Sequence, residues 1–232
     1  MSDSPPILSL LETRVLGTLV EKQRTVPDTY PLSLNTLAAG CNQKTSRHPV
    51  LEAGEPEILL ALENLKELGL VSEVSGSRVV RFAHNFEKVL GVPTQASALL
   101  TVLILRGPQT AGELRLNCER LHKFADISAV EAFLEELAAR SAGALAIELP
   151  RLPGARENRW AHLLSGQPAI ESGSGGRGAA SSAQEIDELR SRVAVLEAEA
   201  QAAGLADGAA AHLRRLVAVA REASGHGGRP FH

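Results

Sequence analysis

The sequence predicts a mainly helical α+β protein in which one order of elements, three helices and then a β-hairpin, occurs twice. Apolar residues recur at helical spacing through residues 8–137. Pairs of short β-rich runs follow each set of helices, and glycine, proline and capping residues separate the segments. With 232 residues, 44% of them apolar, the chain can fold as two small domains that each bury a core.

The first occurrence of this order is expected within residues 8–90. Pro27 prevents the first helix from continuing, and Ser33 is a good N-cap for a short second helix. A polar loop over 42–54 leads to the third helix, which Gly69 is placed to end. The expected helices are 8–23, a short one after Ser33, and 55–68, and the expected strands are 71–74 and 79–82.

The second occurrence is expected within residues 91–166. Two capping boxes, Thr110–Glu113 and Ser128–Glu131, predict the starts of its second and third helices. Its first helix, over 96–105, is apolar nearly all round, so we expect it to be buried on more than one side, against the first half or a second subunit. The strands are expected over 144–149 and 159–164.

Three helices followed by a hairpin is the winged-helix order, so the sequence predicts two winged-helix domains in tandem, over 8–90 and 91–166. Residues 167–181 are rich in Gly, Ser and Ala and predict a flexible linker. A short C-terminal coiled-coil helix is expected within 182–223. Its heptad spacing favours a parallel homodimer through four apolar residues, Ile186, Leu189, Val193 and Leu196.

Several motifs in residues 8–166 together resemble the YceH family. They are the stretches at 8–23, 30–33, 41–47, 105–115 and 160–166. The resemblance implies a bacterial cytoplasmic protein with a tandem winged-helix fold, often followed by a coiled segment. It transfers no catalytic residue to this chain.

Composition narrows the expected class of protein. The net charge is −3 and no segment is strongly basic, which argues against a strong nucleic-acid binder. Two cysteines, Cys41 and Cys118, are too few for a disulfide framework and fit a reducing cytoplasm. No apolar run precedes the first helix, so no signal peptide is expected. The apolar run at 96–105 is far shorter than the ~20 residues that span a bilayer, so no membrane partner is expected.

No arrangement of residues predicts catalysis, a metal site or a cofactor, so the chain is interpreted as a non-enzymatic protein. Cys118 and His122 have the spacing of a metal-binding pair, but Cys118 lies on an apolar stripe and no further ligands are placed to complete the site. Cys41 and His48 could form a nucleophile and base, but Cys41 also lies on an apolar stripe. Both cysteines are therefore expected in the core.

Two hypotheses for the ligand remain. The first is a regulator with weak nucleic-acid binding, which the paired winged helices favour slightly. Its contacts would come from a polar loop and the second hairpin, namely Asn42, Gln43, Lys44, Arg47, Arg151, Arg156 and Arg159. The alternative is a protein-interaction scaffold that does not bind DNA. It is favoured by the glutamates along both expected third helices, which a phosphate backbone would repel.

Overall fold

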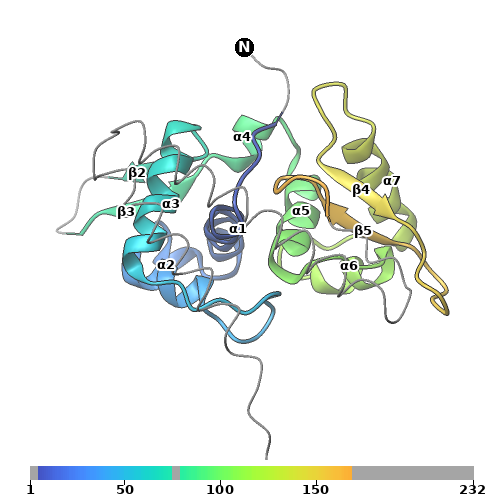
Figure 1. Cartoon of the computed structure of the whole chain (residues 1–232), viewed down its shortest axis with the longest axis horizontal. Helices are drawn as coiled ribbons and strands as arrows, with labels where there is room; N and C mark the ends of the chain where they lie inside the picture. Colours follow the sequence, from blue (N-terminus) through green and yellow to red (C-terminus); the bar gives the residue numbers. More distant parts are fainter. Residues whose placement is uncertain (1–4, 75–78, 169–232) are drawn as a thin grey trace, which may run out of the picture. The chain divides into compact units, whose positions relative to one another are not determined.

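The computed structural model describes residues 5–74 and 79–168 and shows an α+β protein that is mainly helical, with two small antiparallel sheets (Figure 1). These residues belong to one compact unit, which extends from Met1 to Ile170. The expected coiled-coil segment at 182–223, with its four seam residues, lies outside the described residues, as does the expected linker beyond residue 168.

The first half contains three main helices and a three-stranded sheet. The strands lie in the order β1-β3-β2, with Leu32 of β1 opposite Phe82 of β3. A short helix, α4, follows the sheet and leads into the second half. The elements are α1 (Leu10–Thr25), η1 (Pro27–Thr29), β1 (Leu32–Ser33), α2 (Leu34–Cys41), α3 (Glu55–Glu67), β2 (Val71–Val74), β3 (Arg81–His84) and α4 (Phe86–Leu90).

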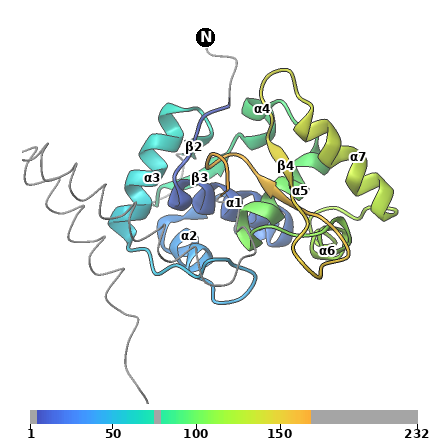
Figure 2. The same ribbon diagram turned by 45° about the vertical axis from the view of Figure 1, so that its right-hand side comes forward.

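The second half repeats this order. Its hairpin strands pair in antiparallel fashion, and Gln109 forms an antiparallel bridge to Trp160 at the position where β1 stands in the first half. Figure 2 shows the hairpin beside α5 and α7. The elements are α5 (Thr94–Arg106), α6 (Ala111–Asn117), α7 (Ile127–Ala138), β4 (Ala146–Leu149) and β5 (Arg159–His162).

Most predicted helix ends are confirmed by their capping contacts. The Ser33 hydroxyl accepts a hydrogen bond from the Thr36 amide, and Gly69 follows α3 with a left-handed φ of 69°. The capping box at Thr110 forms as predicted. The box predicted at Ser128 is wrong, because Asp126 caps α7 instead and Ser128 lies within the helix. An acceptor two residues upstream takes the Ala129 amide.

Two further differences concern the end of the first sheet. The predicted strand at 79–82 is observed at Arg81–His84, and α4 was not predicted. The register shift follows from Phe82, whose side chain is buried, whereas Val79 and Val80 are more than half exposed. Helix α4 forms because Phe86 and Leu90, one turn apart, are both buried against the core.

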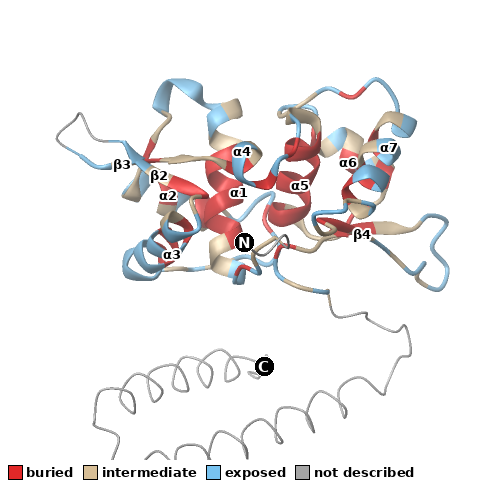
Figure 3. Ribbon diagram, turned by 90° about the horizontal axis from the view of Figure 1, so that it is seen from above, coloured by how far each residue is buried: buried red, intermediate tan, exposed pale blue. Residues whose placement is uncertain are grey.

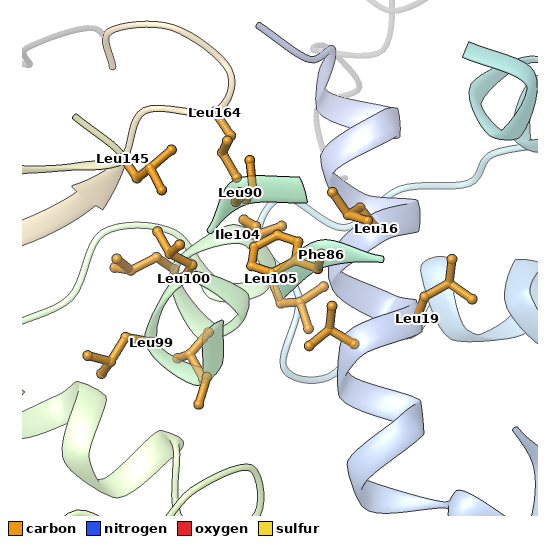
Figure 4. Close-up of a cluster of buried hydrophobic side chains, with 14 of the residues drawn as sticks. Leu16, Leu19, Phe86, Leu90, Leu99, Leu100, Ile104, Leu105, Leu145 and Leu164 are labelled. Atoms are coloured by element: carbon orange, nitrogen blue, oxygen red, sulfur yellow. The ribbon is translucent and has the colours of Figure 1, made fainter. Parts of the chain in front are cut away.

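The centre of the molecule is the packing of α1 against α5 (Figure 3). Every residue from Ala96 to Leu105 is buried, and Ile104 and Leu105 lie between the two helices beside Phe86 (Figure 4). The expectation that this apolar helix packs against the first half is therefore confirmed. Because α1 and α5 share one core, the two halves cannot separate without exposing large apolar side chains to water.

Candidate interaction surfaces

The loop between α2 and α3, expected to contact nucleic acid, is largely held by contacts inside the protein. Asn42 donates from Nδ2 to the Ala53 carbonyl at 2.8 Å and accepts from the Ala53 amide at 2.9 Å. This pair of hydrogen bonds closes the loop at its base. The Asn42 amide is therefore a structural group in this conformation, and a ligand would have to break both bonds to use it.

Arg47 points into the protein, with its side chain fully buried. Its guanidinium donates to both carboxylate oxygens of Glu21, at 2.6 and 3.2 Å, and to the Gly40 carbonyl at 3.0 and 3.2 Å. Burial by itself raises the pKa of Glu21, but the hydrogen bonds and charge of Arg47 outweigh it and lower that pKa overall. Contrary to the sequence interpretation, Arg47 is thus not available at the surface for a phosphate.

A second buried arginine, Arg14, was missed by the sequence analysis. It lies in the middle of α1 with no exposed surface and donates to the carbonyls of Cys41, at 3.2 Å, and Pro49, at 2.7 Å. A single arginine within an apolar stretch of helix was the available signal, but its loop partners are distant in sequence. Together Arg14 and Arg47 fasten both ends of the loop to α1.

The same loop also joins the two halves. The His48 amide donates to the Leu105 carbonyl at 2.7 Å, and Arg106 Nη2 donates to the Ser46 hydroxyl at 2.8 Å. The loop is therefore a strut between α1 and the end of α5. Of the residues predicted to contact nucleic acid here, Lys44 is exposed and Gln43 is partly exposed.

The second hairpin carries the other predicted cations. Arg151 and Arg156 are exposed and Arg159 is partly buried. Arg151 and Arg156 line a cleft of about 330 Å³ between the hairpin and α7, together with three carboxylates, Glu131, Glu148 and Glu157. Asn158 donates to Glu148 at 2.8 Å within it. Because carboxylates outnumber guanidiniums in the cleft, its local charge does not favour a phosphate.

The outward faces of α3 and α7 are acidic. On α3 the exposed residues include Glu55, Glu57, Glu63 and Glu67, and they also include Leu59 and Leu60. Lys66, the basic residue of this helix, pairs with Glu73 of β2. On α7 the exposed residues are Ile127, Ser128, Glu131, Ala132, Glu135 and Glu136, and none of them is basic.

Both cysteines lie in the core, as predicted. Cys118 has no exposed surface and its thiol donates to the Ala98 carbonyl at 3.6 Å. Burial raises the pKa of Cys118 to about 12 and that of Cys41 to about 11. A thiol with such a pKa carries almost no thiolate at neutral pH, so neither is an activated nucleophile. His122 packs edge-on against Phe124, with ring centres 4.7 Å apart.

Two searches of residues 5–74 and 79–168 gave no result. Within these ranges no three or more His, Cys, Asp or Glu side chains are grouped so that they could hold a metal ion. No helix in the same ranges combines the length and apolar character needed to cross a bilayer.

Comparison with known proteins gives a consistent family. Residues 8–155 match the family model described as "Protein of unknown function, DUF480". A UPF0502 protein of Dechloromonas aromatica is 75% identical over 199 residues, covering 86% of this chain and 93% of the relative. UPF0502 proteins of Burkholderia thailandensis and Burkholderia ambifaria are 66% and 68% identical, covering 71% and 69% of this chain and 70% and 67% of the relatives.

Proposed function

The chain belongs to the DUF480 family, and we propose that it is a non-enzymatic, tandem winged-helix protein that binds other proteins through α3 and α7. The element order supports this fold, because each half has three main helices followed by a hairpin. The strand order β1-β3-β2 and the Gln109–Trp160 bridge add the short strand that pairs with the hairpin in each half. In winged helices that bind DNA, the third helix commonly enters the major groove.

The charge of the two third helices is the observation that carries the proposal. Duplex DNA presents one phosphate charge about every 1.7 Å along its axis. The exposed faces of α3 and α7 would bring glutamates toward that charge, with Lys66 already paired to Glu73. A protein surface has no such uniform charge, so the same faces can bind a protein of complementary charge.

A regulator with weak nucleic-acid binding remains the second candidate, and the exposure of Lys44, Arg151 and Arg156 favours it. Gln43 and Arg159 would add contacts. Asn42 and Arg47 would contribute only by shaping the loop, because their side chains are engaged inside the protein. In this case binding would rest on phosphate contacts from the loop and the second hairpin and would depend strongly on salt.

We also propose that the protein is cytoplasmic and a homodimer. Its two free, buried thiols fit a reducing compartment. The dimer would form through Ile186, Leu189, Val193 and Leu196, which lie outside the described residues and are proposed from their heptad spacing alone. Light scattering after size exclusion at tens of micromolar tests it, and Leu189→Asp should shift the mass toward a monomer.

A site-specific crosslinking experiment tests the protein-binding function. A photoreactive amino acid is placed at Glu63 on α3, at Ala132 on α7 or at Arg156 on the second hairpin, and cells are irradiated. Protein adducts at the two helix positions, identified by mass spectrometry and reduced at Arg156, are expected. Nucleic-acid adducts at Arg156 with no protein adducts on either helix would contradict the proposal.

A DNA titration tests the second candidate directly. Fluorescence anisotropy with random duplex DNA at low salt should show no binding by the full chain at about 100 µM, the weak end of non-specific affinity. If binding occurs, Lys44→Ala and Arg156→Ala should each flatten the salt dependence by about one unit per lost phosphate contact. Glu57→Gln and Glu135→Gln should then leave binding unchanged or strengthen it.

A further inference from the structure

Helix α3 exposes an apolar anchor at the middle of its outer face. Leu60 is 57% exposed and Leu59 is 41% exposed. At the helical period, Leu60 points away from the buried stripe of Ile58, Leu62 and Leu65. These two leucines therefore do not complete the core of the first half. Two neighbouring leucines on one exposed helix face are a feature of surfaces that bury apolar groups against a partner.

A rim of carboxylates surrounds this anchor. Glu57 lies three residues before Leu60, Glu63 three residues after it and Glu67 seven after it, so all three share its side of the helix. Glu57 Oε2 also accepts the Gly54 amide at 2.7 Å and is thereby held at the start of the helix. The nearest cation on the helix, Lys66, is occupied by Glu73 on the adjacent strand β2.

We infer that this outer face of α3, defined by Glu57, Leu59, Leu60, Glu63 and Glu67, is the docking site of a basic amphipathic helix from another protein. The inference rests on the proposed protein-binding function and names the partner's chemistry. A helix carrying leucines on one face and lysines or arginines beside them would cover Leu60 and pair with Glu63 and Glu67. Both features repeat at three- and four-residue spacing, which is the spacing that a second helix matches.

Helix α7 provides the contrast that selects α3. Its outer face also carries carboxylates, at Glu131, Glu135 and Glu136, but the residue between them is Ala132. Ile127, the exposed large apolar residue of α7, stands at its first turn and lines the cleft with Arg151 and Arg156. The middle of α7 therefore offers charge without an apolar anchor, which makes it a matched control for the anchor on α3.

A binding titration with a synthetic probe tests the inference. The probe is a fluorescein-labelled peptide of about 18 residues, the length of five helical turns, with leucines and lysines in an amphipathic pattern. A second peptide carries glutamate in place of each lysine. Anisotropy with the full chain should show saturable binding of the lysine peptide at tens of micromolar, weakening as salt rises, and at least about tenfold weaker binding of the glutamate peptide.

Variants locate the site. Leu60→Ala should weaken binding of the lysine peptide about tenfold, since it removes the anchor. The pair Glu63→Gln and Glu67→Gln should weaken it to a similar degree and reduce its salt dependence. The pair Glu135→Gln and Glu136→Gln on α7 should change it by less than about twofold. All of these residues are exposed, so circular dichroism of each variant should match the wild type.

Three results would overturn the inference. Equal binding of both peptides, or equal losses from the α3 and α7 variants, would show that the anchor does not select the ligand. Self-association of the wild type that Leu60→Ala abolishes would make a second copy of this chain the occupant. Protein adducts in the crosslinking experiment with no binding of the lysine peptide would reject this partner while leaving the protein-binding function in place.

Discussion

Gly17 of α1 lies directly against Ile104 of α5: a Cβ on Gly17 would stand 2.8 Å from Ile104 Cγ2 and 3.2 Å from Leu105 Cδ2. Real Cβ atoms essentially never approach another atom so closely. The absence of a side chain at residue 17 therefore sets how near the two helices come. Because these helices belong to different halves, this contact determines how the whole described unit is assembled.

We expect Gly17→Ala to destabilise the protein despite the better helix propensity of alanine. Propensity favours alanine by about 1 kcal/mol, whereas overpacking a core costs about 1–3 kcal/mol, so a net loss of about 1 kcal/mol is expected. Urea unfolding followed by circular dichroism measures it. Gly112→Ala on α6 is the control, because its nearest neighbours are 3.9 Å away, and it should be neutral or stabilising.

A double-mutant cycle ties this effect to Ile104. Ile104→Ala removes the Cγ2 atom that the new methyl group would meet, so Gly17→Ala should be better tolerated in that background. Additive effects of the two changes would mean that the loss in Gly17→Ala has another source. The tryptophan at 160 lies in the second half, so its fluorescence should follow the same transition as circular dichroism if the halves unfold together.

The Arg47–Glu21 pair should contribute to stability and not to ligand binding. Arg47→Ala leaves Glu21 partly buried without its partner, and a loss of about 2–4 kcal/mol is expected. Lys44→Ala, three residues away and exposed, should change stability by less than about 0.5 kcal/mol. Equal stability of the two variants in urea would show that the buried pair contributes nothing.

The contribution of this pair should disappear in acid. The pKa of Glu21 is lowered in the folded protein, so the stabilisation is present above the unfolded pKa of about 4.3 and is lost as pH falls through the folded value. The gap between wild type and Arg47→Ala should therefore narrow at low pH. A gap that stays constant down to pH 2 would contradict an electrostatic origin.

Two buried histidines should make the protein sensitive to mild acid. Burial lowers the pKa of His84 and of His162 to about 4. His84 Nδ1 accepts the Phe86 amide at 3.2 Å and its Nε2 lies 2.8 Å from Gln23 Oε1, which fits a neutral ring. The unfolded chain binds protons below about pH 6.5, so stability should fall as pH drops from 6.5 toward 4.

Substitution of these histidines tests that sign. His84→Gln and His162→Gln should each reduce the acid-induced loss between pH 7 and 4.5 by about 2 kcal/mol, whatever their effect at pH 7. Urea midpoints at several pH values measure it. A double variant with the wild-type pH profile would show that other groups govern the acid response.

The thiols should be inert in the folded state. With pKa values raised to about 11 and about 12 by burial, neither Cys41 nor Cys118 should react with Ellman's reagent at pH 8, while both should react in urea. Cys118→Ser should cost about 1–3 kcal/mol through a buried hydroxyl. Stoichiometric zinc in the wild type, lost in this variant, would instead assign Cys118 to a metal site.

Local pattern was sufficient for the elements and for the buried helix of the second half. Spacing of apolar residues and capping side chains depend on neighbours within one or two turns, so the stretches around Ser33, Gly69 and Thr110 could be interpreted correctly. The apolar run at 96–105 likewise predicted burial on several sides. At Ser128 the same reasoning was wrong, because Asp126 offered an equally good cap.

The tertiary structure alone decided which polar residues face solvent. Asn42, Lys44 and Arg47 belong to one polar loop, yet Arg47 is buried because Glu21 and the Gly40 carbonyl satisfy it, and Asn42 is engaged by Ala53. Lys44 has exposed surface in the same loop. A buried charge is stable only beside its partner, and a partner some 26 residues away in sequence leaves no periodic trace in the chain.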